Sequence, residues 1–212
     1  VGDLAAWGAA SNEVRTPQTT ARLVAWAPQG IAAGQPLWLG LQFAHAPHWH
    51  SYWKNPGDAG MAATFDWQLP AGMHAGEVQW PAPVKITVGN MANYGYDGNV
   101  LLAVPVTVSQ PVAGSVSVAL DASWLVCRKE CVPEQGHFRL QLPAGKPLLA
   151  DAAAFATTRA AVPQTLAGTT VAAAVAKDGQ SITFSSNTLP ASWRGKTLNR
   201  YPEAPDVIQP AA

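Results

Sequence analysis

The sequence has few charged residues: Asp, Glu, Lys and Arg make up 12% of its 212 residues, and their formal charges cancel. Soluble domains usually carry about twice that share of charge. A chain without net charge has no electrostatic basis for binding nucleic acid or an anionic membrane surface. We therefore expect no nucleic acid and no membrane contact among the partners of this chain.

Long apolar runs are also missing. The richest candidate, PLLADAAAFATTRAAVP, is interrupted by Asp151 and Arg159, whereas a membrane-spanning helix needs about 20 apolar residues. The N-terminus has no basic segment followed by an apolar one, which a signal peptide would require. We expect the chain, as numbered, to be soluble and to contain no signal peptide.

Cysteine is scarce, because the chain holds only Cys127 and Cys131. An even number of cysteines fits an oxidising compartment. Glycine, proline and tryptophan are abundant, with 18, 18 and nine residues. This composition is typical of a secreted or periplasmic β protein.

Alternating apolar and polar residues predict about seven short strands, each bounded by Gly, Pro or Asn. Helical crossovers between them are missing, which argues against a parallel α/β sheet. Strands at intervals of about ten residues are typical of an immunoglobulin-type β-sandwich. The predicted strands are 20–28, 35–45, 63–70, 84–89, 100–108, 115–127 and 137–143.

The pattern divides the chain into three parts. Residues 1–146 are predicted to form an immunoglobulin-like domain, and the Ala-rich residues 147–164 a connector with one helix over 147–161. Residues 165–212 contain a KDGQ turn, which is a good hairpin signal. We predict that this last part is a second β domain or a partial one.

The cysteine pair lies in SWLVCRKECVPEQGHF, where Cys127 ends a strand and Cys131 begins the next segment. A tight turn brings such a pair within the ~4.4–6.8 Å between Cα atoms that a disulfide requires. Closing so short a loop stabilises less than the ~3 kcal/mol expected for fifteen residues. A disulfide that closes a short loop in a turn is readily strained and is accessible to other thiols, and both properties favour exchange.

The residues between the cysteines would tune their reactivity. Arg128 and Lys129 favour thiolate over thiol, and Glu130 partly offsets them. Three other interpretations stay open: a disulfide that only stiffens its turn, a Cu(I) site made of the two thiolates, and a zinc site. Zinc is disfavoured because two thiolates make half a site.

A second unusual segment is HAPHWHSYWKNPGDAG. His48 and His50 flank Trp49 in the sequence, so on a strand their side chains would project from the same face. Together with His45, these imidazoles would suit copper or zinc. No carboxylate or thiolate stands at ligand spacing, so we favour an aromatic-lined surface and predict no metal and no cofactor. The aromatic residues of that surface would be Trp49, Tyr52 and Trp53.

The segment NMANYGYDGNVLL predicts a loop before a strong strand. Its tyrosines either lie on the surface or form a flap over the disulfide that excludes water and stray thiols. No GxSxG or HExxH motif is present, so hydrolase chemistry has no support. The residues alone do not choose between the two roles of the loop.

Four stretches together carry a resemblance to a known family, over roughly residues 20–143. They resemble the N-terminal periplasmic domain of DsbD-type transmembrane thiol–disulfide reductases, in particular the ScsB branch, named for suppression of copper sensitivity. The four stretches are HWHSYWKNPGDAG, FDWQLPAG, VQWPAPVKITVGNMANYGYDGNVLLAVPV and LDASWLVCRKECVPEQGHF.

The resemblance implies an electron relay in the periplasm, within a fragment of an inner-membrane protein. A thioredoxin-like domain of the same reductase would donate electrons, and a soluble periplasmic thioredoxin-fold protein would accept them. By position, Cys127 and Cys131 match the redox pair of the family. We expect Cys131 to form the mixed disulfide with the partner and Cys127 to resolve it.

The cap loop of the family matches Asn93, Tyr94, Gly95 and Tyr96 by position. One departure is the spacing, because three residues separate the cysteines here and five do in the best-known DsbD domains. The competing hypothesis is an immunoglobulin-like binding module with a structural disulfide, holding copper through His45, His48 and His50.

Overall fold

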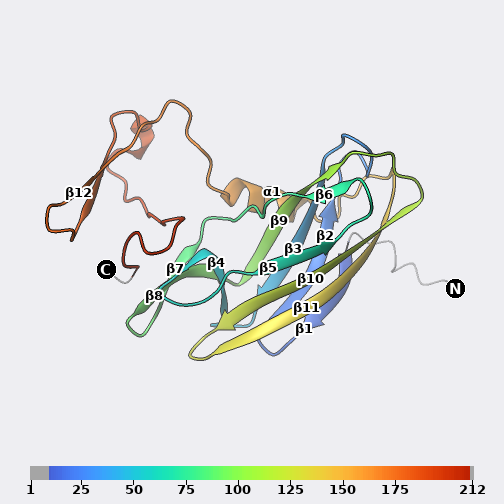
Figure 1. Ribbon diagram of the computed structural model, residues 1–212, viewed down its shortest axis with the longest axis horizontal. Helices are drawn as coiled ribbons and strands as arrows, with labels where there is room; N and C mark the ends of the chain where they lie inside the picture. The colour runs from blue at the N-terminus through green and yellow to red at the C-terminus, as the bar shows by residue number, and fades with distance from the viewer. Residues whose placement is uncertain (1–9, 211–212) are drawn as a thin grey trace. The chain divides into compact units, whose positions relative to one another are not determined.

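The computed structural model describes residues 10–210, in which eleven strands form two antiparallel sheets that pack face to face (Figure 1). The first sheet has five strands, in the order β1-β2-β3-β9-β6. These strands are β1 (Ala10–Arg15), β2 (Thr19–Trp26), β3 (Leu37–His45), β9 (Asn99–Val108) and β6 (Met73–Ala75).

The second sheet has six strands, in the order β11-β10-β4-β8-β7, with β5 paired to β10 alongside β4. The longest pair is β10–β11, which crosses the front of the sandwich in Figure 1. The strands are β4 (His50–Gly57), β5 (Thr64–Gln68), β7 (Val84–Val88), β8 (Met91–Asp97), β10 (Ser115–Cys127) and β11 (Cys131–Pro143). The architecture confirms the predicted immunoglobulin-like sandwich.

Every segment predicted as a strand overlaps one, but four strands are absent from the prediction: β1, β4, β6 and β8. β4 reads HSYWKNPG and β8 reads MANYGYD, and both contain residues that favour turns. They are strands because they pair with each other inside the second sheet. Tertiary pairing overrides local propensity at these positions.

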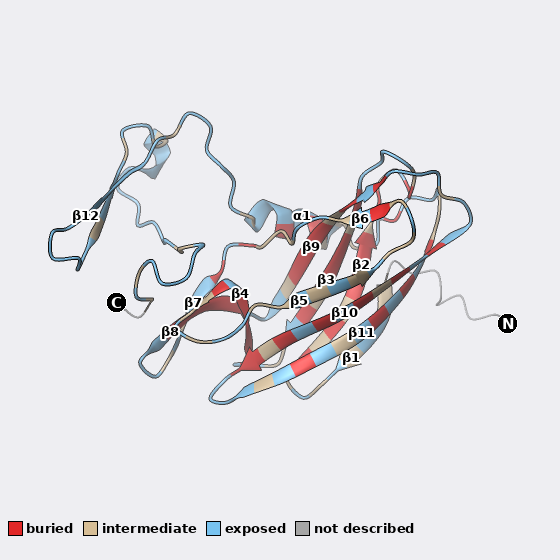
Figure 2. Ribbon diagram, viewed as in Figure 1, coloured by how far each residue is buried: buried red, intermediate tan, exposed pale blue. Residues whose placement is uncertain are grey.

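The hydrophobic core lies between the sheets. Alternate residues of β10 and β11 point into it, which Figure 2 shows as alternating buried and exposed bands. Trp124 meets Phe43 of the opposite sheet edge-on, with ring centroids 5.1 Å apart, and Phe138 lies beside it. Large apolar residues at every second position are buried between the two sheets and pack them against each other.

The predicted helix is present but shorter, because α1 covers Ala152–Ala161. It packs on the outer side of the first sheet, where Phe155 is fully buried and lies 6.1 Å from the ring of Trp26. Thr158 donates a hydrogen bond to the Leu101 carbonyl oxygen. No helix among residues 10–210 is long and apolar enough to cross a membrane.

Contacts divide the chain into two units. The larger comprises the described residues up to Val162 and those from Tyr201 onward, and the smaller comprises Pro163–Arg200. The smaller unit contains the predicted hairpin, formed by β12 (Ala172–Val175) and β13 (Ile182–Ser185), and the short 3-10 helix η2 (Ala191–Trp193). The residues after Arg200 thus contact the sandwich, whereas the pattern grouped them with the second β region.

Candidate functional site

Cys127 and Cys131 form a disulfide at the tip of the β10–β11 hairpin, with their Cα atoms 4.1 Å apart, slightly closer than the expected range of ~4.4–6.8 Å. The two residues are the last directly opposed pair of the ladder, which runs without interruption from Ser115↔Pro143. Within the turn, the Arg128 amide donates a hydrogen bond to the Glu130 carbonyl oxygen at 3.0 Å. The disulfide therefore adds a covalent bond to a turn that the ladder already closes.

The two cysteines differ in exposure. Cys127 is only 3% exposed, because β10 is flanked by β11 on one side and by β4 and β5 on the other. Cys131 is exposed, because it begins β11 at the end of the sheet order. An approaching protein would therefore reach Cys131 first.

The disulfide lies on the outer face of the second sheet. Side chains alternate along a strand, and Trp124 and Val126 point into the core. Asp121 and Ser123 point outward and are exposed. Cys127 lies an even number of residues from both, so its side chain projects from the same outer face. Its low exposure consequently comes from other residues that cover the outer face.

Tyr52 of β4 provides part of this cover, because its hydroxyl lies 4.0 Å from Cys131 Sγ. The loop after β4 packs against the Tyr52 ring. Gly60 approaches the ring so closely that a Cβ would come within 2.2 Å of it, and its φ of +114° also favours glycine. The loop is tied to β8, because Asp58 accepts a hydrogen bond from the Ala92 amide at 2.8 Å.

The predicted cap residues lie in strand β8 and not in a loop, so that part of the prediction is wrong. Tyr94 packs against Trp53 and Tyr201, and the Tyr96 hydroxyl donates a hydrogen bond to the Pro81 carbonyl oxygen. Burial raises the pKa of both phenols. The rings belong to the core cluster, on the face opposite the disulfide.

The other two residues of the predicted cap have different contacts. Asn93 accepts a hydrogen bond from the Ala59 amide at 3.0 Å, in the loop that covers Tyr52. Gly95 lies against β4, where a Cβ would come within 2.0 Å of the Ser51 carbonyl oxygen. The segment therefore supports the residues that cover the disulfide, and the shielding role itself stays a prediction.

Arg128, Lys129 and Glu130 are exposed beside the sulfurs, at the positions predicted. The Arg128 guanidinium lies 5.3 Å from the centre of the Trp49 ring, which holds this positive charge next to the turn. The effect of the three residues on the cysteine pKa values stays a prediction.

The three histidines do not form a metal site. His48 lies in the turn before β4 with a φ of +70°, so the prediction that it shares a strand face with His50 is wrong. His45 uses both ring nitrogens: Nδ1 donates to the Gly98 carbonyl oxygen, and Nε2 accepts from the Ser51 hydroxyl. The part of the chain that the structure describes contains no group of three ligands suited to a metal ion.

His50 lies beside the disulfide, a position that the sequence did not reveal. It is 3% exposed, its ring meets Tyr52 edge-on, and its Nε2 is buried without a hydrogen-bond partner among the described residues. Its backbone forms a bridge with Cys127. Only the pairing of β4 with β10, across 77 residues of sequence, reveals this neighbour.

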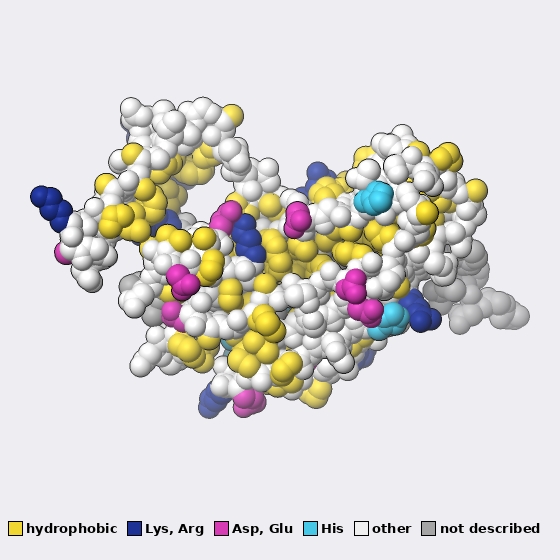
Figure 3. All heavy atoms as spheres, viewed as in Figure 1, with side chains coloured by type: hydrophobic (Ala, Val, Ile, Leu, Met, Phe, Trp, Pro, Cys, Tyr) yellow, Lys and Arg dark blue, Asp and Glu magenta, His cyan; other side chains and the backbone are white. Residues whose placement is uncertain are grey.

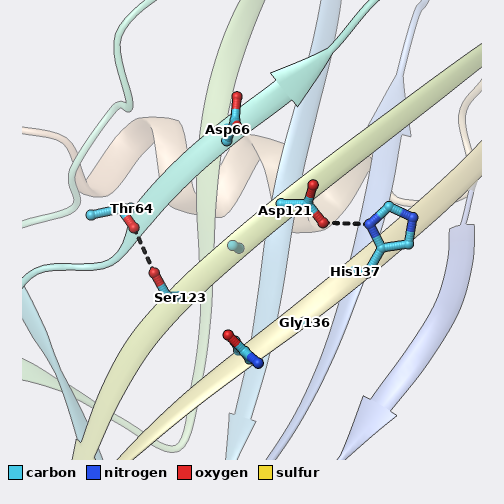
Figure 4. A pocket seen from close by; sticks show the side chains of 8 residues that line it. Thr64, Asp66, Asp121, Ser123, Gly136 and His137 are labelled. Atoms are coloured by element: carbon cyan, nitrogen blue, oxygen red, sulfur yellow. Dashed lines mark hydrogen bonds and ion pairs between the residues drawn. The ribbon is translucent and has the colours of Figure 1, made fainter.

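A polar hollow lies farther along the same outer face, on β5, β10 and β11 (Figure 4). In it, His137 and Asp121 point toward each other, His137 Nδ1 donates a hydrogen bond to an Asp121 carboxylate oxygen, and the Thr64 and Ser123 hydroxyls lie 2.7 Å apart. Ser123 is four residues from Cys127, or about 13 Å along the strand. On the face in Figure 3, charged side chains are scattered and do not gather into one patch.

Comparison with known proteins adds to this geometry. Residues 20–143 match the model of the family described as thiol:disulfide interchange protein DsbD, N-terminal. The chain belongs to this family. Together, the family and the Cys127–Cys131 disulfide support a thiol–disulfide exchange domain.

Two solved structures are similar to the chain. The N-terminal periplasmic domain of ScsB from Proteus mirabilis has a TM-score of 0.60 at 21% identity, over 78% of this chain and 64% of that chain. The reduced N-terminal domain of DsbD from Neisseria meningitidis has a TM-score of 0.36 at 12% identity, over 57% of this chain and 84% of that one. No curated protein matches the chain in sequence.

Proposed function

We propose that this domain passes electrons in the periplasm through the Cys127/Cys131 dithiol. The donor is a thioredoxin-like domain of the same membrane-embedded reductase, and the acceptor is a soluble thioredoxin-fold protein. The observation that carries the proposal is the unequal exposure of the two cysteines on the hairpin tip, one exposed and one buried. This arrangement suits a dithiol that meets its partner through one sulfur only.

The exchange proceeds in two displacements. The Cys131 thiolate attacks one sulfur of the partner disulfide, forms a mixed disulfide and releases the other partner sulfur as a thiolate. The Cys127 thiolate then attacks Cys131 Sγ, which restores the Cys127–Cys131 disulfide and releases the second partner thiolate. Two electrons leave the domain, and the partner becomes a dithiol after protonation.

The residues around the turn have supporting roles in this proposal. Arg128 and Lys129 favour the Cys131 thiolate, and Glu130 moderates them. Tyr52 and the loop that contains Gly60 shield the sulfurs from small thiols, whereas the Asn93–Tyr96 segment holds this cover in place. The contacts of Asn93 with Ala59 and of β8 with β4 support this indirect role.

The test uses a purified thioredoxin-fold protein in its disulfide form as the electron acceptor. The reduced domain should convert it to the dithiol with one domain consumed per acceptor. Cys127→Ser should stop at a mixed disulfide that survives non-reducing electrophoresis, because the resolving thiol is missing. Cys131→Ser should give neither product, since Cys127 is buried.

The double variant Cys127→Ser/Cys131→Ser is the matched control for non-covalent association. A reduced wild-type domain that leaves the acceptor oxidised would refute the proposal. Trapping through Cys127 in the Cys131→Ser variant, with no trapping in Cys127→Ser, would reverse the two roles.

A further inference from the structure

Four residues from four strands form one row across the second sheet. Register pairs Cys131 of β11 with Cys127 of β10, Cys127 with His50 of β4, and His50 with Asp97 of β8. Directly opposed residues in antiparallel strands have Cβ atoms about 4.5–5.5 Å apart and project from the same face. The row thus brings together two sulfurs, an imidazole and a carboxylate in that order.

The imidazole in this row is free to accept a proton. His50 Nε2 is buried, and it has no hydrogen-bond partner in the described part of the chain. An unpaired buried ring nitrogen is costly, and it calls for an explanation. Tyr52, two residues along the same face, reaches Cys131 Sγ, so this side of β4 faces the disulfide.

The surroundings of His50 keep it neutral near neutral pH. Burial lowers its pKa, the nearby His45 of β3 lowers it further, and Asp97 of β8 raises it. The other groups around it are Tyr52 on its own strand and the cysteines of β10 and β11. A neutral imidazole has one nitrogen that accepts a proton, which is the form a base requires.

We propose that His50 accepts the proton of the Cys127 thiol when Cys127 resolves the mixed disulfide, and that Asp97 is a positioning residue for the imidazolium that forms. This inference rests on the proposed exchange function and names the base for its second displacement. Cys127 is only 3% exposed, so solvent has little direct access to its proton.

The partner is held on Cys131 as a mixed disulfide when this step begins. The proton of Cys127 Sγ moves to His50, and the electron pair left on sulfur attacks Cys131 Sγ. The Cys127–Cys131 bond forms, the bond from Cys131 to the partner sulfur breaks, and the partner leaves as a thiolate. The proton then passes from His50 to that thiolate or to solvent.

The size of the effect follows from thiol ionisation. At pH 7 about 3% of an ordinary thiol with a pKa of about 8.5 is ionised. Complete transfer of the proton to a base therefore accelerates the attack by at most about thirty-fold. We expect removal of the His50 base to slow resolution roughly 10- to 30-fold at about pH 7.

The experiment separates the two displacements with a nitrobenzoate disulfide reagent whose released thiolate is coloured. The fully reduced domain should release a first equivalent of colour when Cys131 attacks and a second when Cys127 closes the disulfide. In His50→Phe and His50→Gln, the first phase should keep its rate and the second should slow by the factor above. Cys127→Ser, which releases only the first equivalent, defines the first phase.

The pH profile distinguishes a base from a merely structural residue. In the wild type, the closure rate should level off above the lowered pKa of His50, whereas in His50→Phe it should rise about tenfold per pH unit until the thiol itself ionises. Asp97→Asn should move the midpoint of the wild-type profile to lower pH, because Asp97 raises the pKa of His50.

His48→Asn is the matched control, because His48 is exposed in the adjacent turn and asparagine tolerates its positive φ. Both of its phases should equal those of the wild type. Wild-type closure rates in both His50 variants, or slow closure with an unchanged pH profile, would overturn the role of His50. Release of a single equivalent by the wild type would instead refute the exchange function, and the role of His50 with it.

Discussion

The proposal that the disulfide is a switch predicts that its reduction leaves the fold intact. The bond closes a loop with a sequence separation of 4. For a loop this short, the chain-entropy relation gives about 2 kcal/mol, compared with about 4.7 kcal/mol for a 100-residue loop. The other pairs of the β10–β11 ladder and the buried Trp124 and Phe138 do not depend on this bond, so we expect them to persist after reduction.

We therefore expect reduction to lower the free energy of unfolding by about 2 kcal/mol. For a chain of this size, that corresponds to a fall in Tm of roughly 4–8 °C. The measurement is urea unfolding, followed by tryptophan fluorescence, of the oxidised domain and of the domain kept reduced by a dithiol. Cys127→Ser/Cys131→Ser, in which no thiol can react, is the matched control and should unfold like the reduced form.

The reasoning would be refuted by a loss of more than about 4 kcal/mol on reduction, or by the loss of a cooperative transition. Either result would mean that the hairpin depends on its covalent bond. The disulfide would then be a structural staple, and a domain that cycles between disulfide and dithiol would not be viable.

Three further predictions concern the residues that support the site. Gly95→Ala should lower the free energy of unfolding by about 1–3 kcal/mol, because its Cβ would meet a backbone carbonyl of β4. Glu134→Ala should cost about 3 kcal/mol, since it leaves the Trp124 indole, the buried Thr19 hydroxyl and the half-buried Thr16 hydroxyl without this acceptor. Stability should fall as the pH drops below about 6.5, because burial lowers the pKa of His45 and His50 in the folded state and the unfolded chain binds more protons there.

Urea unfolding measures all three. Glu130→Ala, in the exposed turn, is the control for Glu134→Ala and should change the unfolding free energy by less than about 0.5 kcal/mol. The pH effect should become smaller in His45→Gln. An unfolding free energy that rises as the pH drops below about 6.5 would contradict the burial of His45 and His50. An unfolding free energy unchanged by Gly95→Ala or by Glu134→Ala would contradict the packing described for those two residues.

Much of the sandwich could be predicted from the sequence because its strands alternate strongly. β10 reads SVSVALDASWLVC, and burial follows nearly every second residue. β4 and β8 could not be predicted in this way, since polar and turn-forming residues interrupt both. They are held as strands by one another and by their neighbours, which a local pattern does not contain.

The candidate site shows the same division. The cysteines and the charged turn between them could be found from their spacing alone. The ring next to the sulfur could not, because the family resemblance pointed to Tyr94 and Tyr96, whose rings lie in the core cluster. Tyr52 lies at the sulfur instead, since the register of β4 decides which face each residue occupies, and a shift of one residue would reverse it.

By itself, the sequence determined that a β-sandwich carries two cysteines on a short turn between two strands, because alternation and spacing are local properties. Tertiary structure alone decided which cysteine is buried and that His50 and Asp97 continue the row of sulfurs. These neighbours come from three separate parts of the chain. Their meeting depends on strand order and register, which many weak contacts over the whole sandwich fix together.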